Sequence, residues 1–352
     1  MIDLLKFFIA VLCLLIMGCK TPNTVQQLSS ISPVQPLNTD KELSTIAFGS
    51  CNHQHEAQPM WQHILENQPE LWIWLGDNIY GDTEDMEVMA KKYQQQVAHK
   101  DYQPMLKTVP MIGTWDDHDY GVNNGGKEYP QKEMSKLLFE NFIGLAADSP
   151  VRKRAGVYNA YTFGKAPKQV KVILLDCRSF RDEPPGKNAS ESAVQQADIL
   201  GKSQWEWLEK ELSESTANVH IIASGIQILP EDHRFERWDE FPASRAKLFA
   251  LIERHETPNV VFLSGDRHIG EISQMTLPNG KQLTEITSSG LTHSYEKAGD
   301  EPNRHRQGKI VNLRNFGLLQ IDWKANPPSL TANINGIGNK NYETISVTLS
   351  DR

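Results

Sequence analysis

The chain has 352 residues, of which 39% are hydrophobic and 23% charged, and its formal net charge is −8 at pH 7. These values are ordinary for a globular protein, and the length suffices for one large domain or two small ones. The negative balance argues against a broad nucleic-acid-binding surface, although bound metal ions can create a local positive pocket.

The N-terminus predicts an export signal. Lys6 precedes an apolar run at residues 7–17, which ends in Gly18 and Cys19. A run of about 11 residues is too short to span a bilayer, which takes roughly 20, but it matches a signal-peptide core. The run and its ending resemble a bacterial lipobox, so we expect residues 1–18 to be a lipoprotein signal and Cys19 to carry lipid. An ordinary cleaved signal is the alternative. Either way the protein is exported, and the lipobox implies a lipid anchor at a bacterial cell membrane, in the periplasm or on the outer surface.

Residues 19–42 are rich in Ser, Thr, Pro, Gln and Asn and predict a disordered tether before a domain at 43–352. Removal of the signal and lipidation leave Cys51 and Cys177 as thiols. An exported protein with two thiols raises the alternative of a disulfide. The contexts argue against it, because Cys51 lies in a turn that resembles a metal site and Cys177 directly follows a predicted strand.

Strands and helices alternate along most of the domain. Apolar runs predict strands at 43–48, 71–75, 109–115, 168–175, 219–224 and 259–263. Helical patterns occur at 61–67, 85–99, 135–142, 196–212 and 244–256, with a loop at 182–190. From about residue 271 short alternating segments predict antiparallel strands at 272–277, 282–288, 315–323, 329–334 and 342–349. This order favours one α/β domain whose sheets are completed by C-terminal antiparallel strands.

Polar side chains follow nearly every predicted core strand. The run at 71–75 is apolar throughout, breaks at Gly76, and is followed by Asp77, Asn78, Tyr80 and Asp82. The other strand ends supply Cys51; Asp117, His118 and Asp119; Gln227; and Asp266 and His268. Each residue alone has an ordinary explanation, such as a turn former, a helix cap or a structural histidine. If the strands share a sheet layer, so many buried carboxylates repel one another unless cations neutralise them.

The ligand types indicate which cations fit. Asp, Asn and Gln oxygens suit calcium, magnesium or manganese. A thiolate with a phenolate suits a stronger Lewis acid, and ferric iron is the natural candidate. A two-metal site with a bridging Asp follows as a hypothesis, since ions about 3.5–4 Å apart suit in-line displacement at phosphorus.

Five phrases carry a family resemblance: GSC at 49–51, GDNIY at 76–80, WDDHD at 115–119, LDCRSFR at 175–181 and SGDRH at 264–268. In this order they resemble the alkaline phosphatase D family of calcineurin-like metallophosphoesterases, from about residue 44 to about residue 320. The resemblance implies a four-layer αββα sandwich of two mixed sheets. It also implies a dinuclear site of Fe³⁺ with Ca²⁺, with Mn²⁺, Mg²⁺ and Zn²⁺ as alternatives.

The resemblance also assigns metal ligands. Cys51 and Tyr80 match the ferric side of the family site, and Asp77 matches the bridging Asp. Asp117 would bind the second metal ion. His268 is assigned to the first ion and Asp266 to the second, but the two are interchangeable at this stage. Gln227 is a further candidate ligand from its strand end.

Catalytic roles follow by the same resemblance. His118 would protonate the leaving group, and Asp119 would orient it. Arg178 is a candidate phosphate clamp because guanidinium binds two oxygens at once, and a surface salt bridge is its alternative. Candidate pocket residues, each with an ordinary loop role as the alternative, are Asn78, Asp116, His233, Trp238, Asp239 and His293. Asp82 matches no motif and is interpreted as a turn residue.

The sequence therefore predicts a metal-dependent hydrolase of small phosphate esters, of alkaline phosphatase type. We expect an oxygen nucleophile held by metal to attack phosphorus in line. One alternative is a phosphodiesterase acting on phospholipids or phosphate-containing polymers. The other is a lipid-anchored protein that binds metal or ligand without catalysis.

Overall fold

A computed structural model of the chain describes residues 32–186, 188–299 and 301–350. The predicted signal peptide and the lipidation site Cys19 lie outside these residues. Within them, every helix is too short or too polar to cross a membrane. Cys51 and Cys177 are both buried and free, so the disulfide alternative is excluded.

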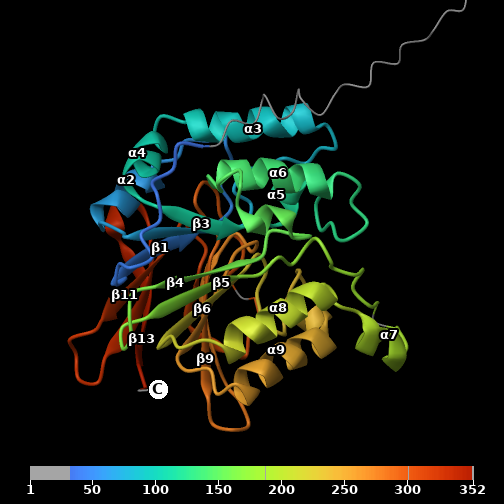
Figure 1. Cartoon of the computed structure of the whole chain (residues 1–352), viewed down its shortest axis with the longest axis vertical. Coiled ribbons are helices and arrows are strands. Elements are labelled where there is room, and N and C mark those ends of the chain that lie inside the picture. The colour runs from blue at the N-terminus through green and yellow to red at the C-terminus, as the bar shows by residue number, and fades with distance from the viewer. Residues whose placement is uncertain (1–31, 187, 300, 351–352) are drawn as a thin grey trace, which may run out of the picture.

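Two mixed sheets lie face to face, with helices on the outer side of each (Figure 1). In the first sheet β1, β2 and β3 are parallel, β11 pairs antiparallel with β1, and β12 and β13 follow, each antiparallel to its neighbour. The order is β13 (Asn341–Thr348), β12 (Ser329–Asn335), β11 (Phe316–Asp322), β1 (Thr45–Gly49), β2 (Leu71–Leu75) and β3 (Met111–Thr114). The C-terminal strands thus complete a sheet begun by the N-terminal ones, as predicted.

The second sheet has a parallel centre with antiparallel strands at its sides. Strands β5, β6, β7 and β9 are parallel, while β4 and β8 run antiparallel to their neighbours. The order is β10 (Arg306–Val311), β8 (Gly270–Thr276), β9 (Gln282–Ser288), β7 (Val260–Ser264), β6 (Val219–Ser224), β5 (Val170–Leu174) and β4 (Asn159–Phe163).

Helices cover both outer faces and produce four layers (Figure 1). Those over the first sheet are α2 (Met60–Glu66), α3 (Met86–Ala98), α4 (Gln103–Thr108), α5 (Asp117–Tyr120) and α6 (Lys132–Phe142). Those over the second are α8 (Gly201–Ser213) and α9 (Pro242–Arg254), with α7 (Glu191–Gln196) beside α9. Short 3₁₀ turns are η1 (Pro150–Lys153), η2 (Trp238–Glu240) and η3 (Ile337–Asn339).

Strand β2 shows why this order of layers forms. Its alternate residues Leu71, Ile73 and Leu75 join the core between the two sheets. Trp72 and Trp74 point the other way and join the core beneath the helices. A strand that is apolar on both faces is stable only between two covering layers. The predicted burial of β2 on both faces is confirmed, since all five of its residues are buried.

The carboxyl ends of the parallel strands of both sheets meet at one edge of the sandwich. The Thr114 hydroxyl at the end of β3 donates to the carbonyl of Leu175, just after β5, at 2.6 Å. The Gly265 amide after β7 donates to the carbonyl of Gly225, after β6, at 3.0 Å. Loops that leave this edge are therefore brought together from both sheets, which is where ligand sites form in α/β folds.

Part of the predicted tether is packed rather than disordered. The amide of Ser32 donates to the carbonyl of Asn141 at 2.9 Å, and Gln35 forms a parallel bridge with Pro110. Val34 packs on the core beneath the helices. The prediction of disorder is thus wrong for residues 32–42, because a few apolar side chains within the polar stretch find a surface to cover.

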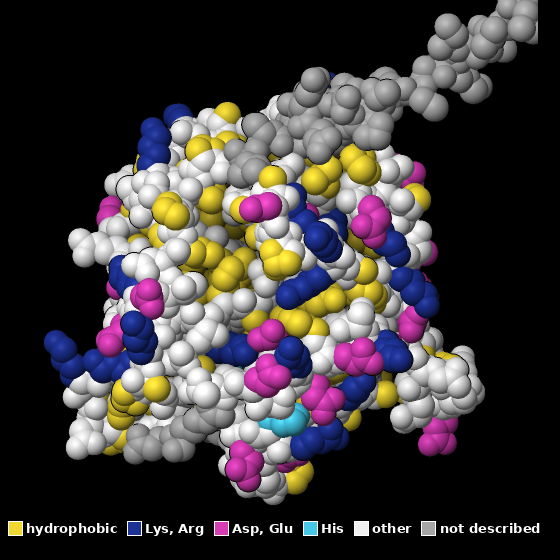
Figure 2. All heavy atoms as spheres, in the orientation of Figure 1, with side chains coloured by type: hydrophobic (Ala, Val, Ile, Leu, Met, Phe, Trp, Pro, Cys, Tyr) yellow, Lys and Arg dark blue, Asp and Glu magenta, His cyan; other side chains and the backbone are white. Residues whose placement is uncertain are grey.

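Some elements were missed or begin elsewhere than predicted. The helix predicted at 196–212 begins only at Gly201, whose φ of +67° lies in the left-handed region and interrupts a continuous helix. Strands β4 and β10 lie at the edges of their sheet and are partly exposed, so they lack an apolar run. On the face shown in Figure 2, basic and acidic side chains are interspersed rather than gathered into fields of one sign.

Candidate metal centre

Sharp turns after the strands aim the ligand side chains at one point. Cys51, Asp77, Asp266 and His268 have φ values of 58°, 50°, 65° and 52°. Residues other than glycine rarely adopt this left-handed conformation, and it costs on the order of 1 kcal/mol or more for each. Four such residues at one edge of the sandwich indicate that the surrounding structure imposes the conformation to place their side chains.

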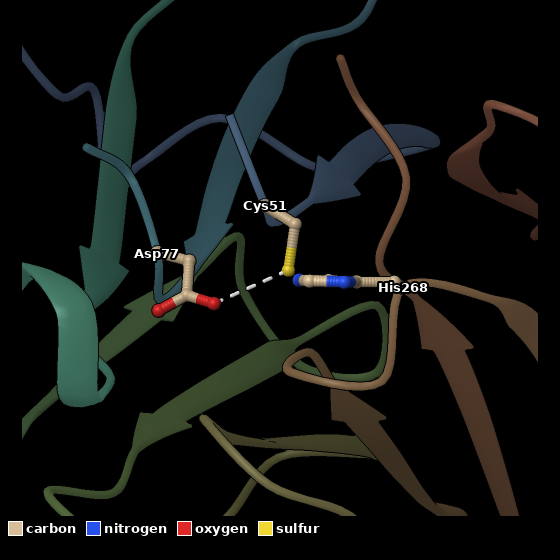
Figure 3. Close-up of side chains that lie close together, drawn as sticks. All are labelled: Cys51, Asp77 and His268. Carbon is tan, nitrogen blue, oxygen red and sulfur yellow. Dashed lines mark hydrogen bonds between the residues drawn. The ribbon is translucent and has the colours of Figure 1, made fainter. Parts of the chain in front are cut away.

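The first cluster joins Cys51, Asp77 and His268, whose ligand atoms lie within 4.8 Å of one another (Figure 3). The Cys51 Sγ lies 3.3 Å from Asp77 Oδ2 and 3.0 Å from the hydroxyl of Ser289. The Tyr80 hydroxyl lies 3.0 Å from His268 Nε2. The side chains assigned to the ferric side thus lie together, and His268 lies with them.

A second cluster shares Asp77 with the first. One group of ligand atoms within 4.8 Å joins Asp77, Asp117 and His118, and another joins Asp77, Asp116, Asp117 and Asp266. Asp77 alone belongs to every group, which is the position expected of a bridging carboxylate. The structure therefore places Asp266 with Asp117 and His268 with Cys51, in line with the preferred assignment.

The clusters are electrostatically unfavourable without cations. Burial, followed by the charges of Cys51 and Asp117, raises the pKa of Asp77 well above its usual range. Burial and the charge of Asp117 raise the pKa of Asp266 to about 6. Burial also raises the pKa of the Cys51 thiol. Metal ions reverse these shifts because they stabilise every ionised ligand.

The donor sets fit two unlike ions. The first cluster offers sulfur, phenol and imidazole, which suit a transition metal, while carboxylates dominate the second and suit a hard ion. Three buried oxygens at this edge, Asp116 Oδ2, Asn78 Oδ1 and Gln227 Oε1, have no hydrogen-bond partner among the described residues. Unsatisfied buried oxygens are costly unless something binds them.

Gln227 is held through its nitrogen. Its Nε2 donates to Glu271 Oε2 at 3.0 Å and to the Thr287 hydroxyl at 2.8 Å. This leaves Oε1 as the available donor atom of the side chain. No hydrogen bond joins Gln227 to either cluster in the part of the chain that the structure describes, so its role as a ligand stays a prediction.

His118 has a carboxylate partner that the sequence did not indicate. Its Nδ1 lies 2.6 Å from Asp82 Oδ1. Burial lowers the pKa of His118, but the hydrogen bond to Asp82 and the charge of Asp117 outweigh this and raise it to about 9. The interpretation of Asp82 as a turn residue is therefore incomplete. The contact joins two loops 36 residues apart, and no local motif signals it.

Asp119 does not orient His118, so that prediction is wrong. Its carboxylate is fully buried and accepts the backbone amides of Asp77 at 3.2 Å and Asp116 at 2.7 Å. It also accepts from Asn78 Nδ2 at 2.5 Å. Asp119 thus fixes the two loops that carry the metal ligands. Asn78, also fully buried, is part of this support rather than a pocket residue.

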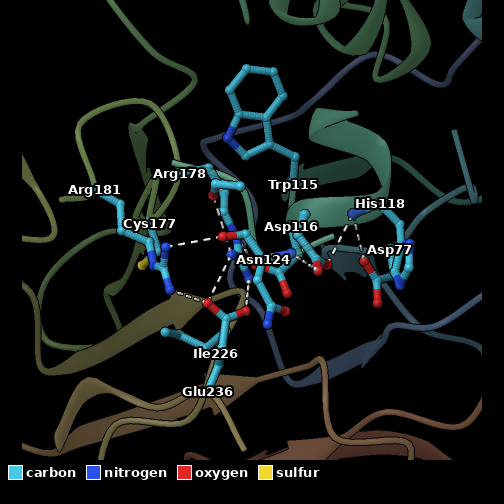
Figure 4. Close-up of polar contacts among 12 residues, drawn as sticks. Asp77, Trp115, Asp116, His118, Asn124, Cys177, Arg178, Arg181, Ile226 and Glu236 are labelled. Atoms are coloured by element: carbon cyan, nitrogen blue, oxygen red, sulfur yellow. Dashed lines mark hydrogen bonds and ion pairs between the residues drawn. The ribbon is translucent and has the colours of Figure 1, made fainter. Parts of the chain in front are cut away.

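Arg178 is not a phosphate clamp, and it is not a surface salt bridge either. It is 0% exposed. Its Nε donates to Asp116 Oδ1 at 2.7 Å and its Nη2 to Glu236 Oε2 at 2.9 Å (Figure 4). Arg181 pairs with the same Glu236. Because its buried guanidinium forms ion pairs with two carboxylates, Arg178 positions Asp116 in the second cluster and is not available to bind substrate.

A cavity of about 520 Å³ opens beside the second cluster. Its lining includes Asp117, His118 and Asp266 from the centre and Arg234, Phe235 and Tyr295 from the rim. The rim differs from the predicted one. Trp238 is fully buried, with its indole nitrogen 3.1 Å from the Ser224 hydroxyl, and His233 and Asp239 line a neighbouring cavity. The sequence thus predicted the correct segment for the cavity rim but the wrong residues within it, because Arg234 and Phe235 line the cavity whereas His233, Trp238 and Asp239 do not.

Three solved structures share this fold. The structure of PhoD has a TM-score of 0.69 and 20% identity, covering 89% of this chain and 70% of that one. GAP50, the anchor in the inner membrane complex of Plasmodium, has a TM-score of 0.56 and 13% identity, and the match covers 89% of this chain and 90% of that one. A dimetal phosphatase from Danio rerio has a TM-score of 0.50 and 12% identity, and the match covers 88% of this chain and 100% of that one. At these identities the likeness concerns the fold.

Sequence comparison defines the family. Alkaline phosphatase D of Bacillus subtilis (strain 168) is 24% identical over 287 residues, which are 69% of this chain and 48% of that protein. The chain thus spans about half the length of this curated relative. A family model described as PhoD-like phosphatase matches residues 46–327, a range that holds both ligand clusters and the loops between them. By fold, ligand set and sequence alike, the chain belongs to the PhoD-like phosphatase family.

Proposed function

We propose that the protein hydrolyses phosphate esters at a dinuclear metal centre. The observation that carries this proposal is the position of Asp77, which two unlike ligand clusters share beside a cavity lined by Asp117, Asp266 and His268. Residues that would hold the first ion are Cys51, Asp77, Tyr80 and His268; those for the second are Asp77, Asp117 and Asp266. We propose Fe³⁺ for the first position and Ca²⁺ for the second. Such ions neutralise the charge that develops on phosphate and act as Lewis acids.

His118 is positioned to donate a proton to the leaving oxygen. It lines the cavity beside Asp117. Because Asp82 occupies its Nδ1, Nε2 is the nitrogen left to donate. The hydrogen bond to Asp82, together with the charge of Asp117, outweighs the effect of burial and favours the protonated imidazole, which is the form that donates. General acid catalysis of this kind typically contributes about 10²–10⁴-fold.

Arg234 replaces Arg178 as the candidate for phosphate recognition. Arg234 is exposed on the rim of the cavity, and it forms no ion pair with any described residue. Its guanidinium lies 5.1 Å from the Phe235 ring centroid, which orients it along the rim. A guanidinium free of carboxylates can bind two oxygens of an incoming ester.

A phosphodiesterase is the second candidate among enzymes. The cavity is walled by the rings of Phe235 and Tyr295, whose centroids are 6.2 Å apart. This apolar wall would accommodate a second ester substituent on phosphorus. The contrasting hypothesis is a non-catalytic binding protein, a role suggested by the likeness to GAP50, an anchor.

One assay separates these hypotheses. The purified protein is incubated with p-nitrophenyl phosphate and with bis-p-nitrophenyl phosphate, and its metal content is measured on the same sample. Faster turnover of the first ester supports a monoesterase, and faster turnover of the second a diesterase. Loaded metals without turnover of either ester would refute an enzymatic function and favour the binding protein.

Export and a lipid anchor at Cys19 are proposals from the sequence. Expression of the full chain in a bacterium with labelled palmitate tests them. We expect label in the membrane-associated protein and none in the Cys19→Ala variant. A cleaved but unlabelled protein would favour the ordinary signal peptide.

A further inference from the structure

A loop after β9 is attached to the loop that carries Cys51. The amide of Leu291 donates to the carbonyl of Ser50 at 3.2 Å, and the amide of Thr292 to the carbonyl of Cys51 at 3.3 Å. The next residue is His293. Its backbone is therefore held beside the first ligand cluster by the same segment that provides the thiol.

Two imidazole nitrogens and a phenol oxygen converge at this point. His293 Nε2 lies 3.0 Å from the Tyr80 hydroxyl and 3.3 Å from His268 Nε2. The Tyr80 hydroxyl lies 3.0 Å from His268 Nε2. Two imidazole nitrogens that face each other across a phenol oxygen need a proton or a cation between them, because their lone pairs repel.

The hydrogen-bond network around Thr292 accommodates one tautomer of His293 that leaves Nε2 free to bind a metal ion. The Thr292 hydroxyl donates its single proton to the carbonyl of Cys51 at 3.2 Å and accepts the amide of His53 at 2.8 Å. In this arrangement the hydroxyl accepts a hydrogen bond from His293 Nδ1, which lies 3.0 Å away. A proton on Nδ1 leaves a lone pair on Nε2, directed at Tyr80 and His268. Metal-binding histidines commonly donate their other nitrogen in this way.

We propose that His293 is an additional ligand of the first metal ion, coordinating through Nε2. This inference rests on the metal centre of the proposed function, but not on which ester the protein hydrolyses. The ion would then have five protein ligands: Cys51, Asp77, Tyr80, His268 and His293. A six-coordinate ion with five protein ligands keeps at most one position for substrate.

The shape of the site agrees with such a crowded first ion. The cavity is lined by Asp117, His118 and Asp266 from the second cluster and by His268 from the first. Cys51, Tyr80 and His293 are not part of its lining. The cavity thus opens toward the residues that would hold the second ion, while His293 contacts Tyr80 and His268 and is not part of its lining.

Titration of the metal-free protein with Co²⁺ tests the proposal without measuring activity. A thiolate-to-cobalt absorption band reports occupancy of the Cys51 side alone. We expect His293→Ala to weaken this site by about 100-fold or more, since even the loss of an outer-shell partner typically costs about 10–100-fold. The matched control is His55→Ala, an exposed histidine in the same aromatic cluster whose Nδ1 contacts Gln95. It should leave the affinity unchanged.

The same titration in a Tyr80→Phe background separates coordination from positioning. If His293 only held the Tyr80 hydroxyl in place, its removal would have no further effect once that hydroxyl is gone. We expect a further loss of affinity in the double variant. Unchanged cobalt affinity in His293→Ala, or an effect that disappears in the Tyr80→Phe background, would overturn the proposal. Neither result depends on hydrolysis, so failure of the proposed function would be seen separately.

Discussion

The hydrogen bond between His118 and Asp82 gives the sharpest prediction for catalysis. Asp82→Asn keeps the shape of the side chain but removes its charge. Hydrogen bonds to charged groups contribute about 1.5–3 kcal/mol. The Asp82 side chain is 42% exposed, so water screens the interaction and the lower end of this range applies. If the interaction is lost from the transition state, about 1.5 kcal/mol corresponds to roughly a tenfold lower rate.

The loss should depend on the leaving group. An alkyl phosphate expels a basic alkoxide that needs a proton from His118, whereas p-nitrophenolate leaves without one. We therefore expect kcat of Asp82→Asn to fall about tenfold on glycerol phosphate and far less on p-nitrophenyl phosphate. Glu84→Gln, an exposed change in the same loop, is the matched control and should alter neither rate.

Two results would refute this reasoning. Equal losses on both esters would mean that Asp82 supports the metal centre rather than proton donation by His118. Unchanged rates on both would mean that the 2.6 Å contact has no role in the reaction. Metal content of the variant distinguishes the first case from simple loss of the ions.

Three further substitutions test the centre and its support. Asp77→Ala should lose both metal ions and all activity, yet remain folded because the substitution removes a buried repulsive charge. Metal analysis and a thermal melting curve of the variant check this. Retention of both ions would contradict the bridging role of Asp77. Cys51→Ser should reduce the occupancy of the transition metal and leave that of the other ion unchanged, as measured by elemental analysis. Full occupancy by both ions would mean that Cys51 is a structural residue and not a ligand. Arg178→Met should lower the free energy of unfolding, measured in urea, by about 3–5 kcal/mol, because Asp116 and Glu236 lose the buried cation that they share. A decrease below about 1 kcal/mol would show that these two buried ion pairs are not structurally important.

The layers of the fold could be predicted because their signals are local. The run of β2 is apolar at every position, so it requires cover on both faces wherever it lies. Strands β6 (Val219–Ser224) and β9 (Gln282–Ser288) also have the predicted bounds, but β9 is antiparallel only to β8 and pairs parallel with β7. Elements at the sheet edges were less predictable, since a half-exposed strand such as β4 or β10 carries no comparable run.

The metal ligands were recognisable because each follows its own strand. Asp77, Asp117 and Asp266 come directly after strand ends, and a sheet brings such ends together whatever the details of packing. Residues that support the ligands were not recognisable in this way. Asp119 has the same composition and position as a ligand, yet its carboxylate serves backbone amides.

Sequence by itself thus determined the α/β architecture, the edge at which the ligands collect, and the kinds of atom that they offer. Tertiary structure decided the pairing of His118 with Asp82, the burial of Arg178 and the approach of His293 to Tyr80. The physical reason is range. Strand burial and turn chemistry depend on neighbours in the chain, whereas these contacts join residues 36 to 213 positions apart and exist only once the two sheets have packed.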